Sequence, residues 1–261
     1  MKLIDTHNHL YLEEFDLDRD LLVKKARDTG IDTILLPNVD LSTVSRMFDL
    51  CDRYPQFAYP MMGLHPTSVG RNYVSELLDI ERYLTKRAYC GIGEIGLDLY
   101  WDKSFLKEQV IVFEEQLKWS LDLDLPVAIH VREAMPYTLE SIYKVGADRL
   151  CGVFHSFAGN ANDLSEIEKL QNFKIVINGV LTFKNAKLAD VINKTSLKKL
   201  LLETDAPYLP PVPYRGKRNE PHYIWKTAEK LADVFETTLD NVVETTRTNA
   251  LGLFKIADSS N

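Results

Sequence analysis

Cysteine is scarce in this chain of 261 residues, and its placement excludes two kinds of structure. The three cysteines, Cys51, Cys90 and Cys151, are odd in number, lie far apart and form no CxxC pair. A disulfide framework needs paired cysteines, and a thiolate metal site needs them closely spaced. We therefore expect free thiols in the reducing environment of the cytosol.

Long apolar runs are also missing. No stretch approaches the roughly 18 consecutive apolar residues that a transmembrane helix requires. At the start of the sequence, Asp5 and His7 interrupt the apolar run almost at once, unlike the continuous apolar region of a secretory signal peptide. The sequence predicts a cytoplasmic protein with no membrane partner.

Basic residues are fewer than acidic ones. Lys and Arg number 31 against 38 Asp and Glu, which gives a formal net charge of -7 and no general electrostatic attraction to nucleic acid or to an anionic membrane. A substrate that bears phosphate would have to be held by a local site. With 45% hydrophobic and 26% charged residues, the composition is that of a globular protein, and we expect residues 1–261 to form a single domain.

Short apolar segments alternate with longer segments of helical periodicity along the whole chain. We predict strands at 2–9, 32–37, 57–65, 90–98, 126–131, 151–157, 173–179 and 199–205, and helices at 16–30, 41–55, 73–87, 105–124, 136–146, 162–172, 186–194 and from about 222 onward. Eight units of about 33 residues match the repeat of a (β/α)8 TIM-type barrel, an α/β fold. An open doubly wound sheet is the alternative, but no glycine-rich phosphate loop follows the first strand.

Ionisable side chains follow most of the predicted strands. In chain order they are His7 and His9, His65, Glu94, His130, His155 and Asp205. The carboxyl ends of all barrel strands open on one face, so we expect these residues to meet there. Without His65 they supply four imidazoles and two carboxylates, enough for two divalent metal ions that share a carboxylate.

A core-packing account of the same residues is the alternative. The His-x-His pair at the start can be incidental, and His130 and His155 can be core histidines. Glu94 can be a cap or an ion-pair partner, and Asp205 can cap the following turn. This account does not explain why five of the six histidines fall at the same end of predicted strands, so we favour the metal site.

Two further segments stand out. The glycines of "GIGEIG" at 91–96 lie inside the strand that delivers Glu94, where they allow either a close approach of the backbone to a site or a tight strand bend. Residues 206–221 contain five prolines and a basic cluster, which predicts a rigid loop over one mouth of the barrel. We expect His222, which follows this loop, to lie at the surface or to cap a helix.

The motifs around these residues resemble those of the TatD family of metal-dependent hydrolases and deoxyribonucleases, a branch of the amidohydrolase-like barrels. The resemblance spans essentially the whole chain and rests on "DTHNHL" at 5–10, "GLHP" at 63–66, "GEIGLDLYWD" at 93–102, the segment 109–134 around His130, "GVFHSFAGN" at 152–160, "LLLETDAPYLPP" at 200–211 and "GKRNEP" at 216–221. One departure is "HVREA", where family members often carry Cys or Ser before the Arg and Asp in place of Glu133.

The resemblance implies a two-metal phosphodiesterase, described in the family as a 3'-5' exonuclease on single-stranded DNA and in some members on RNA. It places one ion on His7, His9, Glu94 and Asp205, and the other on Glu94, His130 and His155. His65 matches a position near the scissile phosphate, and Arg132 is the candidate residue for binding a phosphate through two hydrogen bonds. We expect Asp205 to act as general base for a water held between the ions.

Several alternatives remain at this level. The same ligands also suit an amidase, lactonase or deacylase on a small molecule, and a catalytically silent metal-binding protein is a third possibility. Imidazole ligands favour Zn, Mn, Fe or Co, whereas the family is usually assayed with Mg. We expect a monomer with no obligate protein partner, whose substrate is a single-stranded DNA or RNA end. Bases and phosphates of that strand could meet Tyr100, Trp101, Tyr214, Arg215, Lys217 and Arg218.

Overall fold

The computed structural model describes residues 1–185 and 187–257, and its strands form one parallel sheet. The strands are β1 (Leu3–Asp5), β2 (Ile31–Pro37), β3 (Ala58–Met62), β4 (Gly91–Asp98), β5 (Val127–Arg132), β6 (Gly152–Phe154), β7 (Phe173–Ile177) and β8 (Leu200–Leu202). Each strand pairs with the next one in the sequence. The backbone N–H of Thr6 donates to the carbonyl oxygen of Leu202 (3.1 Å), so the first and last strands also meet. This order confirms the predicted (β/α)8 barrel.

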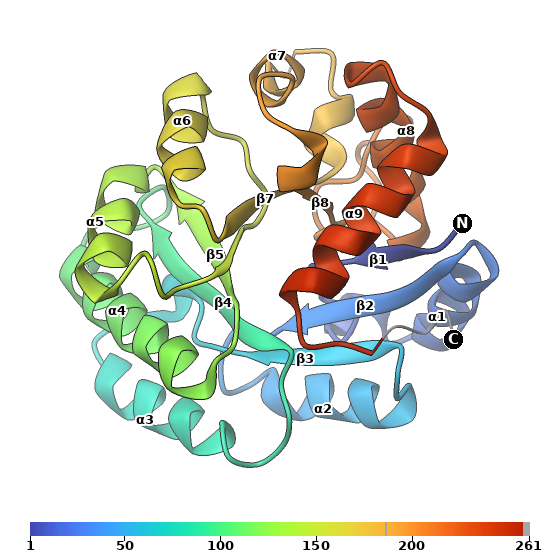
Figure 1. The fold of residues 1–261 in the computed structure, drawn as a ribbon. Coiled ribbons are helices and arrows are strands. Elements are labelled where there is room, and N and C mark those ends of the chain that lie inside the picture. The colour runs from blue at the N-terminus through green and yellow to red at the C-terminus, as the bar shows by residue number, and fades with distance from the viewer. Residues whose placement is uncertain (186, 258–261) are drawn as a thin grey trace.

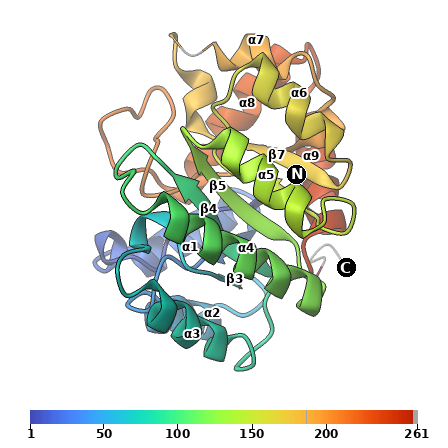
Figure 2. The same cartoon turned by 90° about the vertical axis from the view of Figure 1, so that its left-hand side faces the viewer.

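Helices surround the sheet (Figures 1 and 2). They are α1 (Arg19–Asp28), α2 (Val44–Arg53), α3 (Tyr73–Tyr83), α4 (Leu106–Leu123), α5 (Met135–Val145), α6 (Ala161–Lys169), α7 (Leu188–Ile192), α8 (Ile224–Val234) and α9 (Leu239–Leu253). Side-chain caps mark the starts of α6 and α9. At α6, Asn160 accepts from the backbone N–H of Asp163 (3.2 Å), and Asp163 accepts from that of Asn160 (2.9 Å), which forms a capping box.

Two apolar layers hold the barrel together. The larger one lies between the strands and the outer helices. The smaller one fills the interior and takes one side chain from each strand or its edge, namely Ile4, Leu35, Met61, Cys90, Ala128, Val153, Val176 and Leu201. Ala250 and Phe254, at the end of α9, pack against this interior layer, and α9 lies across one end of the barrel (Figure 1). The ionisable cluster lies toward the carboxyl ends of the strands, with Glu94 within β4 and His130 within β5.

The first strand is shorter than the predicted 2–9 and ends at Asp5. The carboxylate of Asp5 accepts hydrogen bonds from the backbone N–H of Thr204 (2.8 Å) and from the side-chain amide of Asn8 (2.8 Å). These bonds turn the chain out of the sheet and tie it to the segment after β8. His7 and His9 therefore share a side because of this turn, and the prediction that both lie on a strand was wrong.

The helices differ from prediction in detail. The predicted first helix begins only at Arg19. Leu17 and Leu21 are exposed, and Leu22, Val23 and Ala26 supply the buried face. Helix α2 begins after Thr43, later than the start of the predicted 41–55, and makes no side-chain cap. The final helical region consists of α8 and α9. Residue 186, at the start of the predicted helix 186–194, lies outside the described residues.

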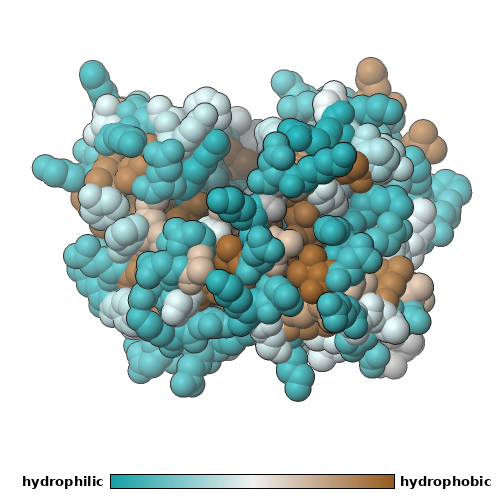
Figure 3. All heavy atoms as spheres, turned by 90° about the horizontal axis from the view of Figure 1, so that it is seen from above, coloured by the Kyte–Doolittle hydropathy of each residue, from teal (hydrophilic) through white to brown (hydrophobic). Residues whose placement is uncertain are grey.

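The surface is mainly hydrophilic on the face seen in Figure 3, with smaller hydrophobic patches between the polar side chains. Within the described residues, no helix is long and apolar enough to cross a membrane. All three cysteines are free, as predicted, and Cys51 and Cys90 are buried.

Candidate metal centre

The carboxylate of Glu94, in β4, lies among the ionisable residues that follow the strands. Its side chain is only 3% exposed. Its Oε2 atom lies 3.1 Å from Nε2 of His7 and 3.7 Å from Nε2 of His9. The two imidazole nitrogens are themselves 3.2 Å apart. One oxygen of Glu94 therefore shares a small volume with two ring nitrogens.

The other oxygen of Glu94, Oε1, faces three more imidazoles. It lies 2.7 Å from Nε2 of His155, 2.9 Å from Nδ1 of His130 and 3.1 Å from Nε2 of His65. The rings come from the ends of β3, β5 and β6, which lie on the same end of the barrel as Glu94. The structure thus brings all five strand-end histidines to one carboxylate.

Asp205 joins the group on the side of His7 and His9. Its Oδ1 atom lies 3.5 Å from Nε2 of His9 and 3.9 Å from Nε2 of His7. Its backbone has a positive φ of 56°, an unfavourable conformation for a residue with a β-carbon. Its N–H donates to the carbonyl oxygen of His7 (2.9 Å), which holds the residue in this conformation. The loops after β1 and β8 are therefore locked together at the site.

The hydrogen bond of His9 to Tyr11 determines where its proton lies. The hydroxyl of Tyr11 donates its single hydrogen to the carbonyl oxygen of Pro37 (2.5 Å). Its oxygen, 2.9 Å from Nδ1 of His9, must then accept from that nitrogen. Neutral His9 consequently presents the lone pair of Nε2 to Glu94 and Asp205.

His130 and His155 each have a second carboxylate on the side of the ring away from Glu94. Nε2 of His130 lies 2.8 Å from Oδ2 of Asp98, and Nδ1 of His155 lies 3.5 Å from Oε1 of Glu203. Glu94 faces the other nitrogen of each ring, so each imidazole lies between two carboxylates and, when neutral, can donate to only one of them. A cation at Glu94 would take the inner lone pair of each ring and leave the proton facing Asp98 or Glu203. Lone pairs of nitrogen and oxygen that face each other repel unless a cation or an extra proton lies between them.

His65 has the opposite arrangement. Its Nδ1 atom accepts from the backbone N–H of Thr67 (3.1 Å), so the proton of the neutral ring lies on Nε2, which donates toward Oε1 of Glu94. His65 is therefore a hydrogen-bond donor at the edge of the site. This arrangement fits the predicted contact with a substrate oxygen better than a metal ligand.

The donor set therefore fits divalent cations. Buried imidazole nitrogens surround both oxygens of Glu94, Tyr11 fixes the tautomer of His9, and Asp98 and Glu203 lie behind His130 and His155. Three clusters of the described residues have potential ligand atoms close enough to hold an ion, namely His7 with His9 and Glu94, His65 with Glu94 and His130, and His7 with His155 and Glu203.

The electrostatics of the cluster agree with this arrangement. Burial alone would raise the pKa of Glu94, but the imidazoles of His155, His65 and His7 hold it well below its usual range. Burial would likewise lower the pKa of His155, but Glu94 and Glu203 raise it well above the usual value. Glu94 is thus an anion held in a buried site by positive charge, and a bound cation would supply that charge without extra protons.

Sequence reasoning missed the residues that orient the imidazoles, namely Tyr11, Asp98 and Glu203. All three are buried, and each follows or precedes a predicted ligand by two to four residues in the sequence. Glu203 is itself held by the backbone N–H of Ser156 (2.7 Å) and the side-chain amide of Asn178 (3.2 Å). A search for acidic residues within four positions of Glu94 and Asp205 would have found the two carboxylates.

Replacement of Asp98 by asparagine is expected to weaken cation binding about 10- to 100-fold, the usual effect of losing a carboxylate behind a metal-binding imidazole. The amide no longer holds the proton of His130 on Nε2 as firmly. Titration of Mn²⁺ or Zn²⁺ by calorimetry measures the change. Asp122→Asn, the same substitution at an exposed position of α4, should leave the affinity as in the wild type, and equal affinities in all three proteins would contradict the assigned role.

A cavity of about 620 Å³ opens over the cluster, and it is lined by Glu94, His65, His130, His155 and Asp205 among others. The predicted substrate residue Arg132 also lines it, with its guanidinium carbon 3.5 Å from the ring centre of Tyr100. Trp101, beside them, is 71% exposed. Tyr208 and Leu209 close another side, so the loop 206–221 lies over the barrel mouth, as predicted.

The basic residues of that loop differ in their surroundings. Arg218 pairs with Asp18 (2.5 Å) and packs over the ring of Phe15, so it is occupied in the structure. Tyr214 stacks on Tyr223, with ring centres 3.7 Å apart. The predicted contact of a nucleic acid strand with these two residues therefore has little support, whereas Arg215 is exposed. His222 is half-buried in a short turn before α8, with Nδ1 3.5 Å from Glu220.

The glycines of β4 combine both predicted roles. A β-carbon on Gly96, which has a φ of 143°, would lie 2.0 Å from the carbonyl oxygen of His130. The pairing of β4 with β5 also shifts register between Ile92 and Ile95. Glycine thus permits a bend in β4 and a close approach of β4 to β5, which together set Glu94 against His130.

Comparisons with known proteins agree with the geometry. The sequence model of the family described as "TatD related DNase" matches residues 4–255. A Bacillus subtilis protein named "Uncharacterized metal-dependent hydrolase YabD" is 35% identical over 255 residues, which cover 97% of this chain and 99% of that protein. A Danio rerio protein named "Putative deoxyribonuclease tatdn3" is 31% identical over 262 residues, which cover 96% of this chain and 96% of that protein.

The solved structures give the same answer. The crystal structure of YjjV, a TatD homolog from Escherichia coli, superposes with a TM-score of 0.91 at 30% identity, over 98% of both chains. A TatD family hydrolase from Entamoeba histolytica has the same fold, with a TM-score of 0.85 at 20% identity over 98% of this chain and 99% of that one. The chain therefore belongs to the TatD family of metal-dependent hydrolases.

Proposed function

We propose that this chain is a monomeric 3'-5' exonuclease that hydrolyses phosphodiester bonds at the ends of single-stranded DNA, and of RNA as a second substrate, with two divalent cations. The observation that carries the proposal is the shared carboxylate of Glu94, since ring nitrogens surround each of its oxygens. The ligands come from a single chain, so the site needs no second subunit.

Two donor sets would hold the cations. One consists of His7, His9, Glu94 and Asp205, and the other of Glu94, His130 and His155. When bound, Mg²⁺, Mn²⁺ or Zn²⁺ at such a site lowers the pKa of water and neutralises charge on a phosphate. The mixture of imidazole and carboxylate suits Zn²⁺ and Mn²⁺ better than Mg²⁺.

Asp205 is the group placed to take a proton from the attacking water. Its carboxylate lines the cavity. Burial would raise its pKa, but the contact with His9 and the charge of His7 lower it below the usual value. Asp205 is thus ionised at neutral pH and able to accept a proton.

Two side chains are placed to bind the phosphate. His65 carries its proton on Nε2 and can donate it to a non-bridging oxygen. Arg132 is held over Tyr100 and lines the same cavity, where its planar guanidinium can grip two phosphate oxygens. The exposed ring of Trp101 next to it offers a surface on which a base can stack. The family description and the name of the Danio rerio relative both support DNA as the substrate.

Removal of metal is expected to lower the release of mononucleotides from single-stranded oligonucleotides at least about a hundredfold, because several kcal/mol of charge stabilisation are lost. Oligonucleotides labelled at either end are incubated with the protein as purified, after chelation, and after addition of Mg²⁺, Mn²⁺ or Zn²⁺. Release that starts at the 3' end and returns with a cation supports the proposal.

Two results would contradict it. Undiminished release after chelation would exclude a role for the cations. Hydrolysis of an amide, lactone or carboxylic ester panel, with no cleavage of DNA or RNA, would instead identify an amidase, lactonase or deacylase, since the same site can direct water to carbon.

A further inference from the structure

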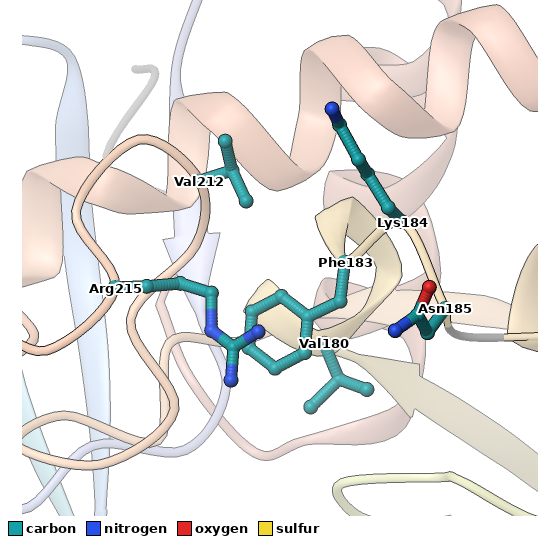
Figure 4. Close-up of a pocket in the computed structure, with 6 residues that line it drawn as sticks. All are labelled: Val180, Phe183, Lys184, Asn185, Val212 and Arg215. Carbon is teal, nitrogen blue, oxygen red and sulfur yellow. The ribbon is translucent and has the colours of Figure 1, made fainter.

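A second cavity, of about 650 Å³, lies beside the metal cavity. It is lined by Val180, Phe183, Lys184, Asn185, Val212 and Arg215 (Figure 4). Val180 also lines the metal cavity, so the two spaces adjoin. The walls of the second cavity come from the segment after β7 and from the loop 206–221, neither of which contributes a histidine to the metal centre.

The cavity combines a ring with two cations. The guanidinium carbon of Arg215 lies 4.1 Å from the ring centre of Phe183, and Figure 4 shows the two side chains together at the centre of the lining. Among the described residues, neither Arg215 nor Lys184 forms an ion pair. Arg218, three positions after Arg215, is paired with Asp18. Free cations beside an apolar ring, in a chain of net charge -7, suit a ligand that is flat and anionic.

The cavity is built before any ligand arrives. The backbone N–H of Val212 donates to the hydroxyl of Thr182 (2.8 Å), and that hydroxyl donates to the carbonyl oxygen of Gly179 (2.7 Å). A β-carbon on Gly179 would lie 2.3 Å from the carbonyl oxygen of Leu209, so the two walls touch at backbone level. Little ordering is needed when a ligand binds between such walls.

We propose that this cavity binds the nucleotide next to the one held at the metal centre, with its base on Phe183 and Arg215 and its phosphate on Lys184 and Arg215. The inference rests on the proposed function, because it needs a nucleic acid strand in the first cavity. The protein should therefore prefer strands to single nucleotide esters, because stacking of one more base raises the affinity about tenfold.

Two substrates of different length test the proposal. The 4-nitrophenyl ester of thymidine 5'-monophosphate reaches only the metal centre, whereas pentathymidylate reaches both cavities. The ratio of kcat/KM for pentathymidylate to that for the ester is expected to fall about tenfold in Phe183→Ala and in Arg215→Ala, through KM. Arg149→Ala removes the same charge at an exposed turn before β6, at the opposite end of the barrel, and should keep the wild-type ratio. Equal ratios in all four proteins would overturn the proposal.

A binding measurement separates this inference from the proposed function. Fluorescein-labelled pentathymidylate is titrated against each protein in the presence of chelator, and its anisotropy is recorded. If the wild type binds the strand, Phe183→Ala and Arg215→Ala bind it about tenfold more weakly, and no protein cleaves it in a separate assay with added cation, the cavity is confirmed while the exonuclease proposal fails. If the wild type cleaves the strand but the two variants bind it as well as the wild type does, the cavity assignment alone fails.

Discussion

Replacement of Glu94 by glutamine is expected to lower kcat/KM for single-stranded oligonucleotides at least about a thousandfold and to abolish tight cation binding. The amide keeps the shape of the side chain but loses the negative charge that the two donor sets share. Its NH₂ group would also point hydrogens at ring nitrogens that lie within 3.1 Å of the carboxylate in the wild type. Metal content after dialysis, measured by mass spectrometry, and steady-state kinetics check the two parts.

The matched control for this change is Glu140→Gln, on the exposed face of α5, which should keep wild-type metal content and activity. Thermal melting monitored by circular dichroism shows whether the Glu94 variant remains folded. Retention of wild-type metal content by a folded Glu94→Gln protein would show that Glu94 is not the shared ligand.

Periodicity was enough to predict the architecture. Apolar segments of strand length alternate with helical ones, and the barrel is the closed form of that alternation. It did not predict where the end strands stop, because β1 ends at Asp5 through side-chain hydrogen bonds with Thr204, almost 200 residues away in the sequence. Such bonds form only in the closed barrel, so a local sequence pattern cannot predict them.

The candidate site was predictable for a topological reason. Carboxyl ends of parallel barrel strands share one face, so residues far apart in the sequence, such as His9 and Asp205, could be expected to meet. Their separation in the structure is 3.5 Å between Nε2 and Oδ1. The spacing predicted which residues assemble, although it could not assign each one a role.

Roles within the site depend on contacts that the sequence does not show. His65 and His130 both follow strands, yet one accepts from the backbone N–H of Thr67 while the other donates to Asp98. In both neutral rings the proton then lies on Nε2, but this atom faces Glu94 in His65 and Asp98 in His130. The ion pair of Arg218 could not be predicted either, because its partner Asp18 is 200 residues away in the sequence.

Replacement of Asp205 by asparagine is expected to lower kcat about 10²- to 10⁴-fold at saturating cation, the usual contribution of a general base. The amide oxygen can still face a cation, so metal content should fall much less than in Glu94→Gln. Single-turnover rates on an end-labelled oligonucleotide measure the change. Asp122→Asn, on the surface of α4, is the control that should leave kcat unaltered.

The pH dependence of this variant separates a base from a ligand. In the wild type, Asp205 is ionised across the neutral range, because His9 and His7 hold its pKa below the usual value, so the rate does not depend on its protonation there. Without it, the proton of the attacking water must leave to solvent hydroxide, and kcat should rise about tenfold per pH unit. If Asp205 only binds a cation, a higher cation concentration would instead restore the rate, and the slope with pH would match that of the wild type.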